Sequence, residues 1–100
     1  MSDEHAKTGF KPVRPQKVLR KVGAMPVKTW SYKSEPGVRH LGPVAQDFHR
    51  AFGLGEDARH IAPLDTSGVA LVGIKALNAR VKRQGRQIAR LQARLAEMKR

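Results

Sequence analysis

The stretch from Ile74 to Met98, IKALNARVKRQGRQIARLQARLAEM, decides the architecture that we expect for this chain of 100 residues. Its apolar residues follow a heptad repeat, the pattern of a coiled coil, with seven of the eight core positions apolar. The a positions are Ile74, Val81, Ile88 and Leu95, and the d positions are Leu77, Gln84, Leu91 and Met98. The segment therefore predicts a long helix that joins several copies of the chain.

The main alternative is a single amphipathic helix that lies flat on the rest of the domain. A stripe only two residues wide per heptad is narrower than the apolar face that such packing usually needs, which favours the coiled coil. β-Branched residues at a with Leu at d favour a coiled coil of two helices, and Gln84 fixes the register at some cost in stability. Composition therefore leaves the number of copies open. Gly85 weakens the middle of the helix by about 1 kcal/mol relative to Ala. The apolar seam, which is the stripe of a and d residues, therefore needs support from the preceding residues.

Residues 1–73 contain all six Pro and eight of the nine Gly, which predicts short elements joined by turns. Pro15 begins a helix that Gly23 ends, and a second helix runs from Pro43 to Gly53 with Phe48 on its apolar stripe. Between them, residues 26–33 and 38–41 read as two strands of a hairpin around the turn at 35–37, with Trp30 and Tyr32 on one face.

The last part of this region, residues 59–64, reads as a short strand or extended segment. Asp65, Thr66 or Ser67 would then cap the following helix. The expected fold class is α+β: a compact head of residues 1–73 with short strands and helices, followed by a coiled-coil helix of residues 74–100.

Composition limits what so short a chain can do. With 40% hydrophobic and 28% charged residues it should fold, but five aromatics and a net charge of +12 leave a weak core, for which oligomerisation is the natural remedy. The chain has no Cys and no apolar run long enough to span a bilayer, so we expect no thiol chemistry and no membrane partner. The four His residues lack metal-site spacing, and no nucleotide-binding motif occurs, so we expect no metal and no cofactor.

The terminal segment is strongly basic, with nine Lys and Arg against Glu97 alone from residue 74 onwards. Clustered cations of this kind bind nucleic acid by releasing counterions from phosphates. The cations also occupy the b, c, f and g positions that a solvated coiled coil fills with charge, and the order of a basic zipper is missing. Nucleic acid is therefore the alternative partner, less favoured than a solvated face, and a basic coiled-coil binding module is the alternative function.

The N-terminal residues Ser2–Lys7, SDEHAK, fit the pattern S-D-x-x-x-K. They precede a V-x-x-W-x-Y strand and the run RHLGPVAQD at residues 39–47. This order resembles the C-terminal intramolecular chaperone auto-processing domain, the endosialidase-type peptidase domain at the ends of phage tail spikes and fibres. The resemblance implies a homotrimer that guides the folding of an upstream passenger of the same precursor and then cuts itself free. It also implies synthesis in the cytoplasm as part of a phage or phage-like tail-fibre precursor.

The resemblance further implies a self-cleaving serine–lysine endopeptidase. Ser2 would be the nucleophile, Lys7 its general base, and the backbone amide of Gly42 the oxyanion donor. A lysine serves as a base only when neutral, so burial must lower its pKa from about 10.4 to about 7 to 8. A spacing of five residues does not by itself bring Ser2 to Lys7, and a turn or a neighbouring protomer must close the gap.

The residues alone do not decide which peptide bond breaks. The resemblance favours the Ser2–Asp3 bond, but attack by a Ser hydroxyl on its own carbonyl passes through a strained four-membered ring. Attack on the preceding carbonyl gives a five-membered ring, and attack from another chain avoids both. Because Met1 directly precedes Ser2, we interpret the chain as the released or excised domain with its activity spent or latent. A trimerisation tag without chemistry is the plainer interpretation.

Overall fold

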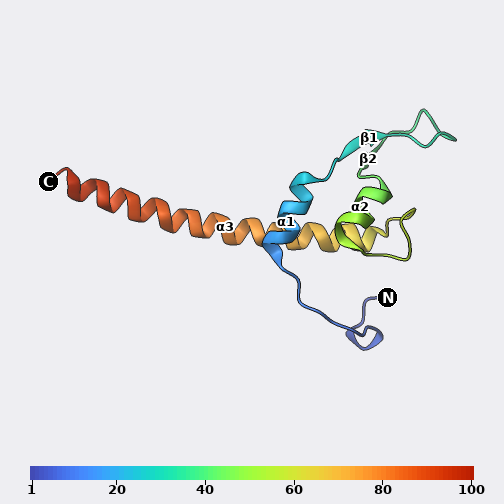
Figure 1. The fold of residues 1–100 in the computed structure, drawn as a ribbon, viewed down its shortest axis with the longest axis horizontal. Helices are drawn as coiled ribbons and strands as arrows, with labels where there is room; N and C mark the ends of the chain where they lie inside the picture. Colours follow the sequence, from blue (N-terminus) through green and yellow to red (C-terminus); the bar gives the residue numbers. More distant parts are fainter.

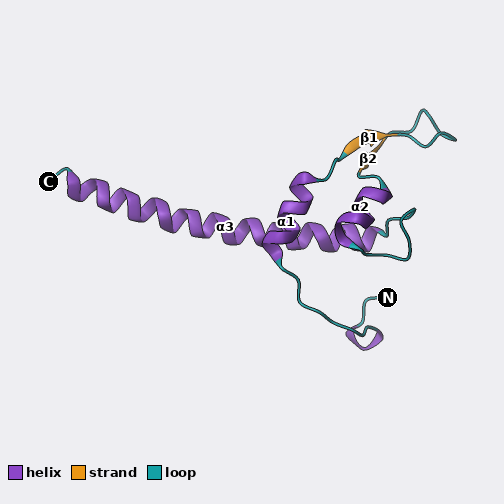
Figure 2. Cartoon of the chain, viewed as in Figure 1, coloured by secondary structure: helices purple, strands orange, loops and turns teal.

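The computed structural model describes all 100 residues and has an elongated shape, with principal extents of 69 × 40 × 21 Å. A single long helix forms the long axis, and the remaining elements gather around its N-terminal half (Figure 1). Helix dominates, and the only sheet has two short strands (Figure 2). In chain order the elements are η1 (Glu4–Ala6), α1 (Pro15–Ala24), β1 (Lys28–Trp30), β2 (His40–Gly42), α2 (Ala45–Phe52) and α3 (Pro63–Met98).

Helix α1 begins at Pro15, as expected, because the fixed φ of proline suits the first helical position. It packs across α3, and a polar contact joins the two helices. Gln16 Nε2 donates to the carbonyl oxygen of Ala76 at 2.9 Å, while Arg80 Nη2 donates to Gln16 Oε1 at 2.9 Å. This crossing positions the head on the long helix.

The predicted hairpin is confirmed, although its strands are shorter than expected. β1 and β2 pair antiparallel, with Trp30 opposite His40 and Lys28 opposite Gly42. The chain leaves the sheet after Trp30 and returns through two turns, closed by the Glu35 N–H on the carbonyl of Tyr32 and the Val38 N–H on that of Glu35. The Trp30 ring lies 4.9 Å from both the Tyr32 and His40 rings, measured between centroids, so aromatic contacts stabilise the end of the hairpin.

Helix α2 ends at the predicted glycine but begins at Ala45, two residues after the predicted start at Pro43. Gly53 adopts a left-handed conformation with φ 62°, and its N–H donates to the carbonyl of His49, the common glycine-based helix end. Phe48 is 2% exposed and its ring lies 5.1 Å from that of Phe52. Phe48 forms the small buried core together with Val69 and Ala76.

Of the two alternatives for residues 59–64, a short strand is wrong, and an extended segment holds only up to Ala62, where the backbone is extended; the predicted cap is also wrong. Residues 53–62 contain no strand, and α3 begins at Pro63 with Ala62 at the N-cap position. Asp65, Thr66 and Ser67 therefore lie inside the first turns of the helix, where the Thr66 hydroxyl donates to the carbonyl of Pro63. Proline started the helix earlier than the capping residues suggested.

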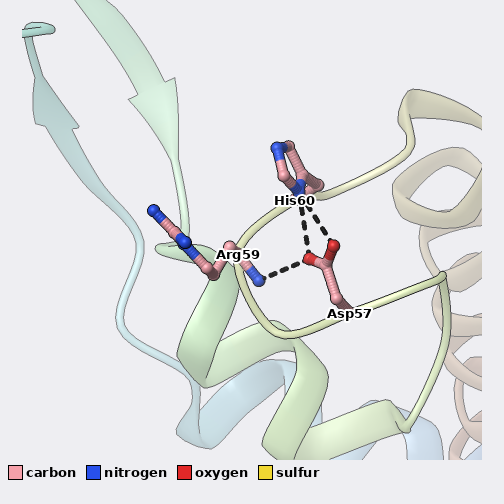
Figure 3. A network of polar contacts seen from close by, with 3 residues as sticks. All are labelled: Asp57, Arg59 and His60. Carbon is pink, nitrogen blue, oxygen red and sulfur yellow. Dashed lines mark hydrogen bonds and ion pairs between the residues drawn. The ribbon is translucent and has the colours of Figure 1, made fainter.

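Asp57 organises the loop before α3. Its carboxylate accepts hydrogen bonds from the Arg59 backbone N–H at 2.8 Å and from the His60 ring at 3.0 Å (Figure 3). Two contacts hold the pKa of the Asp57 carboxyl below its ordinary value. The hydrogen bond from the Arg59 backbone N–H has the larger effect, and the hydrogen bond from the His60 side chain has the next largest. The loop is thus held by one ionised side chain rather than by strand pairing.

Helix α3 runs without a break through residues 73 and 74, where we placed the division between head and tail. At 36 residues it is about 54 Å long. Its buried residues, Val69, Gly73 and Ala76, all lie in the first half, and residues 81–100 are exposed throughout. Figure 1 shows this second half projecting from the head rather than lying along it. None of the helices has both the length and the apolar character needed to cross a membrane.

Candidate functional site

The structure brings Ser2 and Lys7 together within one chain. Lys7 Nζ donates to Ser2 Oγ at 2.7 Å. The short helix η1 makes this possible, because it reverses the chain between the two residues through the Ala6 N–H on the carbonyl of Asp3 and the Lys7 N–H on that of Glu4. A turn, rather than a neighbouring protomer, closes the five-residue gap.

Asp3 is the residue that holds this turn. It occupies the N-cap of η1, where its Oδ1 accepts from the His5 backbone N–H at 2.9 Å and from His5 Nδ1 at 3.0 Å. The backbone hydrogen bond, and after it the side-chain one, lowers the pKa of the Asp3 carboxyl. Asp is among the preferred N-cap residues, and this preference is the sequence signal that predicts the turn. No group of three or more His, Asp or Glu side chains in the structure could hold a metal ion.

Both members of the pair are exposed to solvent. The hydrogen bond runs from the lysine nitrogen to the serine oxygen, whereas general-base catalysis needs the opposite direction, with a neutral amine accepting the hydroxyl proton. The single chain therefore supplies the pairing but not the exclusion of water that a lysine base requires.

Gly42, the third predicted site residue, lies elsewhere in the molecule. It ends β2 opposite Lys28, next to the indole of Trp30, whose Nε1 is buried without a hydrogen-bond partner. A Cβ atom placed on Gly42 would lie 4.0 Å from Trp30 Nε1. The N-terminal turn and the hairpin lie on opposite sides of α3 in Figure 1. One chain thus joins two of the three predicted site residues and keeps the third apart.

The apolar seam of α3 is open in the single chain. Its exposed fractions range from 48% at Leu77 to 83% at Met98; the other members are Ile74, Val81, Ile88, Leu91 and Leu95. The head packs on a different face of the same helix, centred on Val69 and Ala76, which are 8% and 1% exposed. The seam is therefore free to contact another molecule while the head remains in place.

The N-terminal half of the chain matches a known protein family. The family model described as the chaperone of endosialidase matches residues 2–54, which include Ser2, Lys7 and Gly42 and every element from η1 to α2. No curated protein gave a match. Because the family match covers more than half of the residues, from the N-terminal turn through the helix that ends at Gly53, the chain belongs to the chaperone-of-endosialidase family of peptidases.

Proposed function

We propose that this chain is an intramolecular chaperone domain that trimerises an upstream fibre- or spike-like passenger and releases itself by serine–lysine autoproteolysis near Ser2 and Asp3. The observation that carries the proposal is the 2.7 Å contact between Lys7 Nζ and Ser2 Oγ, formed inside the segment that matches the family. The turn capped by Asp3 holds this contact in place within the chain itself, without help from a passenger.

The chemistry follows from the pair. Ser2 Oγ adds to the carbonyl carbon of the scissile peptide while Lys7 Nζ takes the hydroxyl proton, and backbone N–H groups stabilise the resulting oxyanion. The C–N bond then breaks, the leaving amine receives the proton from Lys7, and the acyl group remains on Ser2 as an ester. Water, deprotonated by Lys7, hydrolyses the ester and restores the serine hydroxyl. The event occurs once for each chain.

Assembly would supply what one chain lacks. A lysine loses its proton near neutral pH only when its charge is desolvated, and Nζ of Lys7 is open to water in the single chain. We propose that packing of neighbouring protomers and the passenger covers the N-terminal turn. The Gly42 amide would then reach the oxyanion from a neighbouring protomer, since its own chain holds it on the other side of α3.

Two observations support assembly through the seam. Only four of the 100 residues are buried, which is too small a core for a chain of this size to rely on alone. The apolar a and d side chains of α3, which are partly exposed, would each contribute about 1 to 2 kcal/mol when their remaining surface is buried, before the entropy cost of association. The number of three copies comes from the resemblance, and sedimentation equilibrium measures it directly.

The test uses a precursor that carries part of the passenger before Ser2. Ser2→Ala and Lys7→Ala should remain uncut on a denaturing gel, and Lys7→Arg should do the same because a guanidinium does not act as a base. Ser34→Ala and Lys11→Ala are matched controls, since both residues are exposed and outside the turn. Efficient cleavage of both the Ser2→Ala and the Lys7→Ala precursors would refute the peptidase.

Two further measurements define the geometry. Mass spectrometry of the released domain separates cleavage before Ser2 from cleavage before Asp3. Mixed assemblies of Ser2→Ala and Lys7→Ala precursors should stay uncut, because both residues of the pair come from one chain. Recovery of cleavage in the mixture would instead show that serine and lysine meet across chains.

A further inference from the structure

Helix α3 carries more positive charge than the proposed function requires. Residues 66–96 contain no Asp or Glu and seven Lys and Arg. Five of these cations lie beyond the head, are exposed, and make no hydrogen bond or ion pair within the chain; we call them the basic stripe: Lys82, Arg83, Arg86, Arg90 and Arg94.

The basic stripe lies on one face of the helix. Lys82, Arg86, Arg90 and Arg94 follow each other at four-residue intervals and span about 18 Å, and Arg83 lies beside them. At about 100° per residue, this face points away from the apolar seam except at Arg94, whose g position flanks the seam. A helix that joins other copies through its seam still presents most of the basic stripe to solvent.

Self-assembly cannot neutralise these charges. Cations four residues apart repel each other on a helix. In a parallel coiled coil the neighbouring helix offers the same residues at the same height, and no carboxylate exists between residues 66 and 96 to pair with them. Each added copy therefore raises the positive charge density, which an external polyanion would offset.

We infer that the basic stripe binds the phosphate backbone of duplex nucleic acid without reading its sequence. Four of its five cations are arginines, whose planar fork matches phosphate oxygens. No aromatic residue follows Phe52, so the helix has no side chain to stack on unpaired bases or to anchor in a membrane interface. These features favour a duplex over a single strand or a lipid surface, and they do not depend on the peptidase chemistry.

The experiment measures binding of the full chain to a labelled DNA duplex of about 30 base pairs by fluorescence anisotropy, from about 50 to 200 mM salt. The stripe variant replaces Arg83, Arg86, Arg90 and Arg94 by Gln. The matched control replaces Lys11, Arg20, Lys33 and Arg59 by Gln, which removes the same charge from exposed positions outside α3. Circular dichroism and sedimentation verify that both variants keep the helix content and the oligomeric state of the parent.

We expect the stripe variant to bind about 100-fold more weakly at the lowest salt, with a logarithmic salt slope shallower by about 3 to 4. The control should lose roughly threefold, since charges beyond a Debye length are screened. Equal losses in the two variants would overturn the inference by showing that net charge alone acts. Tighter binding to single-stranded DNA, equal retention on phosphatidylserine vesicles, or no duplex binding at the lowest salt would also overturn it. A seam variant that no longer assembles but still binds the duplex would separate this inference from the proposed assembly.

Discussion

Ala76 and Leu77 are neighbours in the chain but face different surroundings, because Ala76 is 1% exposed and Leu77 is 48% exposed. Ala76 lies where α1 crosses α3, and its carbonyl accepts from Gln16. Leu77 belongs to the open seam. One helix therefore holds its own head on one face and leaves another face free, so that folding and assembly can be changed separately.

Enlarging Ala76 should destabilise the head. Ala76→Leu inserts a side chain where α1 and α3 touch, and we expect the free energy of unfolding in urea to fall by about 1 to 3 kcal/mol. Ala79→Leu is the matched control, since Ala79 is exposed on the same helix and its substitution should change the value by less than about 0.5 kcal/mol. Equal effects at the two positions would contradict the crossing of α1 and α3 at Ala76.

Polar residues in the seam should prevent assembly without unfolding the helix. Ile88→Gln combined with Leu91→Gln removes two apolar seam residues that are 55% and 60% exposed, and burial of this remaining surface between copies contributes about 2 to 4 kcal/mol. Sedimentation equilibrium at micromolar concentration should show smaller species. Ala89→Gln combined with Ala93→Gln places the same residue outside the seam and should leave the mass unchanged; a lower mass for this control would argue against the heptad register.

The contact between Gln16 and Arg80 should couple the two helices. Arg80 Nη2 donates to Gln16 Oε1 at 2.9 Å in a partly buried position. A double-mutant cycle with Gln16→Ala and Arg80→Ala should give a coupling of about 1 kcal/mol in the free energy of unfolding. Strictly additive losses would mean that the two side chains do not interact in solution.

The N-terminal turn should depend on pH through Asp3. Because hydrogen bonds from His5 lower the pKa of this carboxyl, the ionised form stabilises the turn. That stabilisation is complete above the ordinary aspartate pKa of about 3.9 and disappears as pH falls through the lower pKa of the folded chain. An NMR titration should place the Asp3 midpoint below about 3.9 and move it upwards in His5→Ala. An unshifted midpoint would mean that the turn is not formed in the free chain.

Local patterns were enough to predict most of the elements. The hairpin around residues 35–37, the helix ended by Gly53 and the long helix with its exposed seam all follow from periodicity and turn residues that lie close together in the chain. The contact between Ser2 and Lys7 is equally local, because Asp3 caps the turn that closes it. The start of α3 was missed because proline at its first position outweighed the capping residues further on.

Periodicity alone thus determined that the chain has a seam and a basic stripe on different faces of one helix, since both depend only on the helical repeat. Tertiary packing decided which turn of that helix is covered by the head, because the crossing of α1 at Ala76 depends on contacts about 60 residues apart in the chain. It also decided that the hairpin, whose strand β2 ends at Gly42, and the N-terminal turn lie on different sides of α3, which no spacing in the sequence encodes.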